Sequence, residues 1–190
     1  MIRFIILIFI YIFTFLSFCS QALAFWIWTP ESNEWVNPKY SVKDTPGEQL
    51  KYAVGFYDAK KYKEAVQEFE KLIKHYPRAR EAPEAQFYIA KSWEDQGKLY
   101  EAFKQYQKVV DKYPFSERSA EIVKKQFDIG DKLLNGSSKQ EGFLANFKGD
   151  DYDIIDIFKT IIKNAPYGKL APLAQYKIGL YLIEKQLYQE

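Results

Sequence analysis

The side chains that most often do chemistry are scarce in this chain. His75 is the only histidine, so neither a histidine-based catalytic triad nor an ordinary multi-histidine metal site can form. This residue falls at the C-terminal end of an expected helix, where a partly protonated imidazole interacts favourably with the helix dipole. A structural role for His75 therefore fits the sequence best.

Four aspartates form an acidic run where a helix is expected to begin: Asp150, Asp151, Asp153 and Asp156. Their spacing lacks the glycine and the distal glutamate of a calcium-binding loop. N-capping and compensation of the helix dipole explain at least Asp150 and Asp151. We find no phosphate-binding loop, nucleophile elbow or cofactor fingerprint in the sequence. It therefore predicts a protein with no catalytic residues, no metal site and no cofactor.

The N-terminus has the pattern of an export signal. Arg3 is followed by an almost unbroken apolar run, residues 4–18, and then by the small-x-small triplet Ala22-Leu23-Ala24. We expect residues 1–24 to be removed, which leaves a mature chain without cysteine and therefore without a disulfide. Two alternatives stay open. Cys19 is a candidate lipidation site, although a bulky residue precedes it, and the apolar residues after the triplet would suit a retained anchor.

The charge of the chain is balanced. The formal net charge is +2, and lysines are interspersed with acids. Such mixing is typical of solvated helix faces with pairs at i,i+4 spacing. Nucleic acid requires a basic face, and the sequence offers none. We therefore expect proteins, and not nucleic acid, as partners.

A tyrosine–proline pair recurs with similar residues around it. It stands at Tyr76-Pro77 and Tyr113-Pro114, and Ala165-Pro166 is an altered third copy. An aromatic precedes each proline by eight residues, and a small or aliphatic residue precedes that aromatic by four: Phe69, Tyr106 and Phe158, and Ala65, Ala102 and Ile154. This pattern is the second half of a tetratricopeptide repeat, which is a pair of antiparallel helices, here called helix A and helix B.

Two sequence shifts support the repeat. A shift of 37 residues places the first repeat on the second, and a shift of 89 places the second on the fourth; the aligned pairs include Ala53 with Ala90, Phe56 with Trp93, Ala65 with Ala102, and Ala90 with Gly179. Small residues let helix A approach helix B closely, and the aromatics fill the space between pairs. The sequence therefore predicts an all-α tetratricopeptide superhelix of about three and a half repeats.

We divide the chain into a signal peptide, an extended tryptophan-rich arm and a repeat domain: 1–24, 25–44 and 45–190. Thr45 is a suitable N-cap, Pro46 suits the first helical position, and Glu48 completes a capping box. The repeats are expected at 46–79, 83–116, 117–168 and 169–190.

The third repeat contains an insertion, because Pro114 and Pro166 are 52 residues apart, against 37 for Pro77 and Pro114. We expect helix A over 117–134, an inserted loop at 135–150 and helix B over 151–164. The loop holds an apolar cluster that either caps the repeat core or serves as a docking loop: Phe143, Leu144 and Phe147.

The fourth repeat is expected to be incomplete. Glu190 aligns with Glu101, so the sequence stops before helix B begins. Helix A would then expose an apolar face that includes Tyr176, Ile178, Leu182 and Ile183, whereas solenoids normally end in a polar capping helix. We expect an incomplete sequence, or a partner helix that completes the fold.

The helix A positions of a tetratricopeptide array line a groove, so partner binding is expected there. Candidate partner-binding residues counted from Pro46 are Tyr57, Phe87, Lys91, Glu94, Lys124, Asp128 and Tyr176, with Leu50, Val54, Asp131 and Leu180 beside them. The set mixes aromatics with both signs of charge and lacks the run of lysines that would hold a terminal carboxylate. Alternatively, several of these aromatics pack between the repeats.

The arm carries three of the four tryptophans: Trp26, Trp28 and Trp35. They either cap the open edge of the first repeat or mark a membrane interface or partner-docking strand, because tryptophan suits both settings.

The segment from Tyr76 to Ala90 and the sequence Ala165-Pro166-Tyr167-Gly168, together with the export signal and arm, resemble the BamD-like tetratricopeptide proteins of the outer-membrane β-barrel assembly machinery. The resemblance implies a non-catalytic periplasmic scaffold. Its attachment to the outer membrane, through a partner or an N-terminal anchor such as a lipidated Cys19, stays open. Its partners would be envelope or outer-membrane assembly proteins. Two other functions stay open: an envelope adaptor for cell division or peptidoglycan synthesis, and a regulatory subunit of an envelope enzyme.

Overall fold

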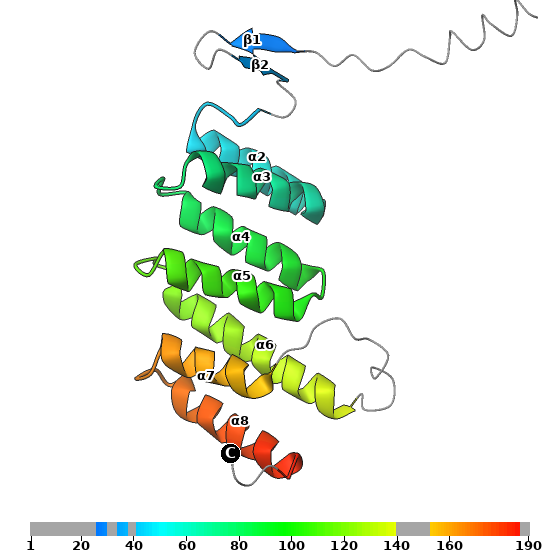
Figure 1. Cartoon of the computed structure of the whole chain (residues 1–190), viewed down its shortest axis with the longest axis vertical. Helices are drawn as coiled ribbons and strands as arrows, with labels where there is room; N and C mark the ends of the chain where they lie inside the picture. The colour runs from blue at the N-terminus through cyan, green and yellow to red at the C-terminus, as the bar shows by residue number, and fades with distance from the viewer. Residues whose placement is uncertain (1–25, 30–33, 38–40, 140–152, 187–190) are drawn as a thin grey trace, which may run out of the picture. The chain divides into compact units, whose positions relative to one another are not determined.

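The computed structural model describes residues 26–29, 34–37, 41–139 and 153–186 (Figure 1). The chain divides into two units, Met1–Ser41 and Val42–Glu190. In the first unit, β1 (Ile27–Thr29) and β2 (Glu34–Val36) pair antiparallel, with Trp28 opposite Trp35. The described residues of the arm are therefore non-helical, as expected, and Trp26, Trp28 and Trp35 are exposed. The expectation that they cap the first repeat stays a prediction.

The described elements of the second unit are all helices, packed one on the next in chain order (Figure 1). They are α2 (Pro46–Asp58), α3 (Tyr62–His75), α4 (Ala82–Asp95), α5 (Leu99–Lys112), α6 (Ser119–Lys139), α7 (Ile154–Asn164) and α8 (Leu170–Glu184). α2, α4, α6 and α8 are helix A of successive repeats, and α3, α5 and α7 are helix B. The predicted all-α superhelix is confirmed.

The helix ends follow from local chemistry. Thr45 is the N-cap of α2, and its Oγ1 accepts a hydrogen bond from the Glu48 N–H at 3.2 Å. After α2 and α4 the chain turns through residues with positive φ, Lys60 at 58° and Gly97 at 75°. Glycine adopts this conformation without steric strain, whereas Lys60 is an unusual residue there.

The recurring proline marks three copies of one turn. Tyr76, Tyr113 and Ala165 each end a helix B and donate the backbone N–H to the carbonyl four residues earlier, at 2.8, 2.8 and 3.2 Å. Their own carbonyls accept from the residue three positions later, at 3.1, 2.9 and 3.0 Å. Proline follows well because it has no N–H to satisfy and cannot continue the helix. The recurring proline in the sequence therefore marks a repeated helix–turn–helix unit in the structure.

Small and aromatic residues occupy the predicted positions in the core. Ala53, Ala65, Ala90 and Ala102 are completely buried, as are three aromatics of helix B: Phe69, Tyr106 and Phe158. The core has two parts, one around α2, α3 and α4, and the other from α4 to α8.

Two expected boundaries of the third repeat, the end of helix A and the start of helix B, were wrong, whereas the end of helix B at residue 164 is confirmed. α6 continues to Lys139, beyond the predicted loop start at 135, and Asn135 donates from Nδ2 to Oδ2 of Asp131 one turn earlier at 3.1 Å. α7 begins at Ile154, and its N-cap is Asp153, whose Oδ1 accepts from the Ile155 N–H at 2.8 Å. Asp150 and Asp151 lie outside the described residues, as do Phe143, Leu144 and Phe147 of the candidate docking loop.

Candidate functional site

The candidate residues Tyr57 and Lys91 meet on the helix A surface. The Tyr57 hydroxyl donates to the carboxylate of Asp95, which joins α2 to α4. The ammonium of Lys91 lies 5.2 Å from the ring centroid of Tyr57 and 5.9 Å from that of Tyr88. Burial and the neighbouring Asp95 carboxylate raise the pKa of the Tyr57 hydroxyl above its ordinary value. We call Tyr57, Tyr88, Lys91 and Asp95 the tyrosine–lysine cluster.

Two other candidates are engaged inside the fold. Phe87 is only 3% exposed, and its ring centroid lies 5.6 Å from that of Tyr106. Glu94 accepts a hydrogen bond from the Tyr106 hydroxyl at 2.7 Å and pairs with the Lys125 ammonium at 3.0 Å. Glu94 thus ties α4 to α5 and α6. Phe87 therefore follows the packing alternative, and Glu94 is likewise held by contacts within the fold.

The remaining candidates lie further along the array. Lys124 and Asp128 are exposed on α6, and Tyr176 is exposed on α8. Asp131 forms an ion pair with Lys177, which connects α6 to α8. His75 is exposed in the last turn of α3, at the helix end where it was expected.

A hollow of about 870 Å³ lies at the N-terminal ends of α2, α4 and α6; its lining includes Leu50, Arg80, Glu84, Phe115, Arg118 and Glu121. The guanidinium of Arg118 pairs with Glu84 at 2.6 Å and with Glu121 at 2.7 Å. The hydrogen bonds that Arg118 donates to these carboxylates, first of all to Glu84, raise the pKa of its guanidinium, which stays charged. We call this feature the inter-repeat hollow.

The inter-repeat hollow was not predicted from the sequence. Its most exposed apolar side chain is Phe115, at 97% exposure. The sequence did contain a clue to it. Phe115 directly follows the helix-ending Pro114, in a turn where polar residues are usual. Glu84, Tyr88 and Lys91 follow one another at i, i+4 and i+7 along α4, so the hollow and the tyrosine–lysine cluster share one side of that helix.

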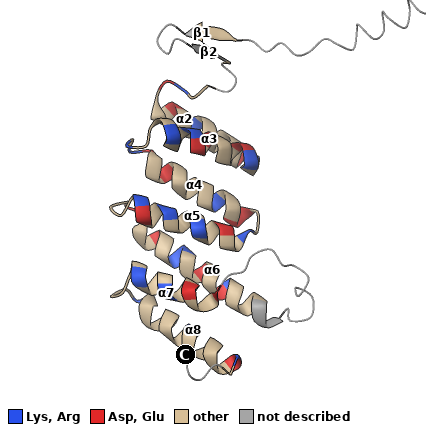
Figure 2. Cartoon of the chain, viewed as in Figure 1, with Lys and Arg blue, Asp and Glu red and all other residues tan. Residues whose placement is uncertain are grey.

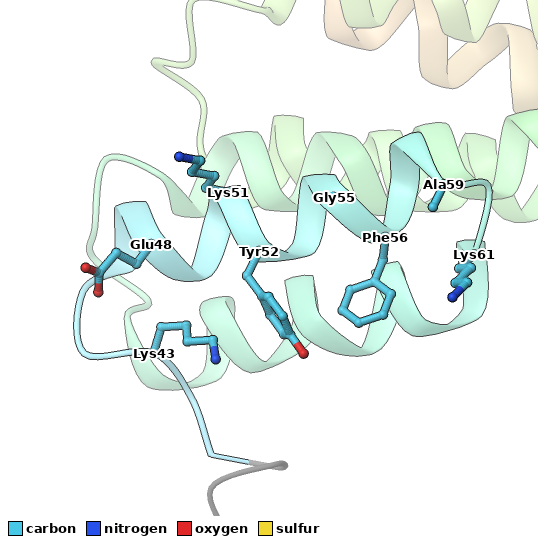
Figure 3. Close-up of a pocket in the computed structure, with 8 residues that line it drawn as sticks. All are labelled: Lys43, Glu48, Lys51, Tyr52, Gly55, Phe56, Ala59 and Lys61. Carbon is cyan, nitrogen blue, oxygen red and sulfur yellow. The ribbon is translucent and has the colours of Figure 1, made fainter.

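A second, more open hollow of about 730 Å³ lies against α2 (Figure 3). The rings of Tyr52 and Phe56 meet edge to face at 5.0 Å, and the Lys43 ammonium lies 4.3 Å from the Tyr52 ring centroid. Lys51 and Lys61 also line the hollow. The rings and lysines of this hollow suit a partner segment in which an acidic residue stands close to an apolar side chain.

The charges in the described part of the second unit are mixed in sign along its helices (Figure 2). Among the described residues, no cluster of three or more histidine, cysteine, aspartate or glutamate side chains is placed to hold a metal ion. No helix within the same ranges combines the length and apolar character needed to cross a membrane.

A family model of the tetratricopeptide repeat matches residues 49–79 and 84–116. These segments lie within the first two predicted repeats, 46–79 and 83–116. No curated protein matches the chain. Tetratricopeptide repeats generally form non-catalytic scaffolds for protein–protein interaction. The chain is therefore an all-α protein that carries tetratricopeptide repeats and has the architecture of a protein-interaction scaffold.

Proposed function

We propose that this chain is a periplasmic scaffold that contributes to the assembly of outer-membrane proteins and binds a partner segment along helix A. The export pattern of residues 1–24 supports the periplasmic location. The resemblance of residues 76–90 to BamD-like proteins supports the pathway. The repeats support binding rather than catalysis.

The surface that carries the proposal runs along one side of α4. At one end is the inter-repeat hollow, with Leu50 and Phe115 for apolar contact and Arg118 held between two glutamates. At the other is the tyrosine–lysine cluster, where Lys91 lies over two rings. The ion pairs hold Arg118, Glu84 and Glu121 in place before a partner arrives, which lowers the entropy lost on binding.

This chemistry suits an internal, extended segment of a partner better than a chain terminus. An apolar side chain of the segment would enter the inter-repeat hollow beside Phe115. Its polar groups would meet Lys91 and the paired charges of Arg118 and Glu84. The surface mixes both signs of charge and has no run of lysines to clamp a terminal carboxylate.

Site-specific photo-crosslinking tests both the surface and the pathway. A benzophenone amino acid at position 115, in the full chain in its native membranes, should capture a component of the β-barrel insertion machinery. The matched control is position 67 on α3, whose Gln67 is exposed and outside both hollows. Equal capture at both positions would refute the proposal that this surface binds the partner.

The identity of the captured protein decides between pathways. Recovery of cell-wall synthases at position 115 would instead support the envelope adaptor function that the sequence left open. Recovery of a single envelope enzyme whose activity changes on binding would support a regulatory subunit. Capture of none of these would contradict all three envelope functions.

The mature N-terminus tests the export part of the proposal separately. Intact-mass spectrometry of the protein from membranes should show a chain that begins at Phe25. A lipidated Cys19 would also keep the protein in the envelope and would add a membrane anchor. An unprocessed chain in the cytoplasm would overturn the proposed location.

A further inference from the structure

One side of α2 carries two aromatic rings between two lysines. Tyr52 and Phe56 lie one helical turn apart, with Lys43 beyond the first ring and Lys61 beyond the second (Figure 3). These four residues line the hollow of about 730 Å³ against α2, which we call the α2 hollow. It is therefore apolar in the middle and positively charged at both ends.

The fold holds Lys43 in place although this residue precedes α2. Its backbone N–H donates to Oε1 of the buried Gln49 at 2.9 Å, and its carbonyl accepts from the Tyr76 hydroxyl at 2.7 Å. Its ammonium lies 4.3 Å from the ring centroid of Tyr52. Hydrogen bonds to α2 and to the end of α3 therefore position one end of the α2 hollow before any partner binds.

Lys61 stands at the other end of the α2 hollow, where α3 begins. It is the N-cap of α3, and its side chain makes no capping hydrogen bond. The N-terminus of a helix favours a nearby acid over a base. An acidic group of a partner beside Lys61 would therefore be attracted both by the ammonium and by the N-terminal end of α3.

The charges around the α2 hollow favour an acidic partner. Three lysines line it, because Lys51 joins Lys43 and Lys61, and Glu48 is the one acid in the lining. Lys51, Lys61 and Glu48 are exposed, and Lys43 is half-buried. A partner that brings acidic residues is attracted by this surplus of lysines, whereas a partner that brings lysines is repelled.

The corresponding face of α4 indicates the shape of the partner. The shift of 37 residues places Tyr52 on Ile89, which is buried in one core cluster with Phe69 of α3. That face of α4 is thus covered by helix B of the preceding repeat, whereas the described residues that precede α2 are not helical. A partner helix can therefore lie on α2 as α3 lies on α4.

The two faces differ in polarity and in the space they leave. The same shift places the exposed Glu48 on the completely buried Ala85, so the face of α2 is polar where the face of α4 is apolar. A Cβ at Gly55 would meet nothing within 4 Å, which leaves room beside the rings. The α2 hollow therefore suits a helix with a narrow apolar stripe and charged edges.

We propose that the α2 hollow binds an amphipathic helix of a partner protein, which carries two apolar residues one turn apart and an acidic residue one turn beyond each of them. The apolar side chains pack on Tyr52 and Phe56, and the acids meet Lys43 and Lys61. This site is additional to the surface along α4, because Leu50 of the inter-repeat hollow lies roughly 160° around α2 from Tyr52. A partner can therefore occupy either surface without blocking the other.

A designed probe peptide tests the chemistry of this site. The probe is a helix of about 18 alanine and glutamine residues, with two leucines four positions apart and a glutamate three positions outside each leucine. A control peptide has lysines in place of both glutamates. Fluorescence anisotropy of the labelled probe, with the full chain in a mild non-ionic detergent, should give a dissociation constant on the order of 100 μM, because the buried area is small. The control should bind at least about tenfold more weakly, and equal binding of the two peptides would overturn the inference.

Charge reversal shows whether the lysines hold the probe. Lys43→Glu and Lys61→Glu should each weaken its binding by about threefold, and the double variant should prefer the control peptide. Lys132→Glu reverses an exposed charge on α6, outside the α2 hollow, and should leave the affinity unaltered. An equal loss in Lys132→Glu would indicate general attraction of charge and would overturn the site.

Gly55→Gln tests the site without changing a charge. Its Cβ meets nothing within 4 Å, so the fold and the far-ultraviolet circular dichroism should be preserved. The rest of the glutamine side chain would occupy the α2 hollow and should weaken probe binding several-fold. Unchanged affinity would mean that the probe binds elsewhere, and would overturn the inference.

Two other occupants of the α2 hollow would give different results. If the tryptophans of the arm filled it, the probe would bind only after Trp28→Ala and Trp35→Ala. If a second copy of the chain filled it, light scattering would show a dimer that Gly55→Gln dissociates. Either result would overturn the inference. Photo-crosslinking at position 115 should be unaltered by Gly55→Gln, so failure of this inference is distinguishable from failure of the proposed function.

Discussion

Arg118 and Glu84 form a two-point ion pair that joins two consecutive repeats. Nε of Arg118 lies 2.6 Å from Oε2 of Glu84, and Nη2 lies 2.6 Å from Oε1. Cζ of the same guanidinium lies 4.2 Å from the ring centroid of Phe87. Arg118 stands immediately before α6, and Glu84 lies in the first turn of α4. One side chain therefore links the repeats by charge and by stacking, and fixes the wall of the inter-repeat hollow.

Arg118→Lys tests this link, because it keeps the positive charge and removes the planar fork. Lysine cannot make the two parallel hydrogen bonds and stacks less well on the ring. The pair is partly exposed, so solvent weakens it, and we expect a loss of about 1 kcal/mol in the free energy of unfolding. Urea denaturation measures the loss, with Arg80→Lys, at an exposed position, as control. Equal midpoints for the two variants would contradict this role of Arg118.

Gly130 and Gly55 should respond in opposite ways to the same substitution. A Cβ at Gly130 would lie 3.0 Å from Cγ2 of Ile157 and 3.4 Å from the ring of Phe158, whereas a Cβ at Gly55 would meet nothing within 4 Å. Alanine is the better helix former at both positions, but at Gly130 the overpacking should outweigh that gain and lower the free energy of unfolding by about 1 kcal/mol. Gly55→Ala should raise it by about 0.5–1 kcal/mol, since alanine is the better helix former. Thermal and urea denaturation of the two variants check the signs, and stabilisation by Gly130→Ala would contradict the close packing of α6 on α7.

The repeat architecture was predictable because it depends on local signals that recur. Each turn after a helix B uses the same backbone hydrogen bonds, so Tyr76 and Tyr113 stand in equivalent positions and reveal the period. Small and aromatic residues at fixed distances from them then identify the core, as at Ala65 and Phe69. A pattern that recurs in the sequence can be recognised without knowing which distant residues are in contact.

The candidate site was less predictable because its side chains are paired across repeats. Position counting placed Phe87 and Glu94 on the binding surface, but contacts with Tyr106 and Lys125 hold them in the fold. Such pairings join residues from different helices and leave no periodic trace. The end of α6 was missed because the turn-forming residues after Leu134 predict a loop, whereas they continue the helix to Lys139.

A buried amide network gives a further prediction. Gln126 is fully buried; its Nε2 donates to Oε1 of Gln107 at 2.9 Å, and its Oε1 accepts from Nδ2 of Asn164 at 2.8 Å. A glutamine in an amphipathic helix is normally predicted to be a surface residue, whereas Gln126 is buried and connects α5, α6 and α7. Gln126→Leu removes both hydrogen bonds and should lower the free energy of unfolding by about 2 kcal/mol, because two partly buried amides lose a partner.

The control for Gln126→Leu is the same substitution at the exposed Gln67 of α3. Equilibrium denaturation should show little change for Gln67→Leu, because surface substitutions are usually within about 0.5 kcal/mol. Similar stability of the two variants would mean that the network contributes nothing to the packing of these helices.

Because of Tyr106, we expect the free energy of unfolding to fall as the pH becomes alkaline. Its hydroxyl is buried and donates to Glu94, and burial first, then the Glu94 carboxylate, raises its pKa above the ordinary value of 10.0. Above about pH 10 the unfolded chain loses this proton while the folded chain retains it, so the free energy of unfolding falls as the pH rises. Below that pH both states are protonated, and the contribution of Tyr106 is fully present. Tyr57, whose pKa is raised by burial and by Asp95, adds to the same slope.

Tyr106→Phe separates the two effects of this hydroxyl. At neutral pH the variant should be about 1 kcal/mol less stable, because Glu94 loses a hydrogen-bond donor. Above about pH 10 the free energy of unfolding of the variant should fall less steeply than that of the parent. The Tyr106 hydroxyl is absent, so only Tyr57 and tyrosines with smaller pKa shifts still contribute to the slope. Urea denaturation across the alkaline range measures both quantities, and Tyr167→Phe, at a fully exposed tyrosine, should leave both unchanged. If Tyr106→Phe keeps the parent's alkaline slope, the hydroxyl is not held protonated by the fold, and the tie between α4 and α5 is weaker than its geometry indicates.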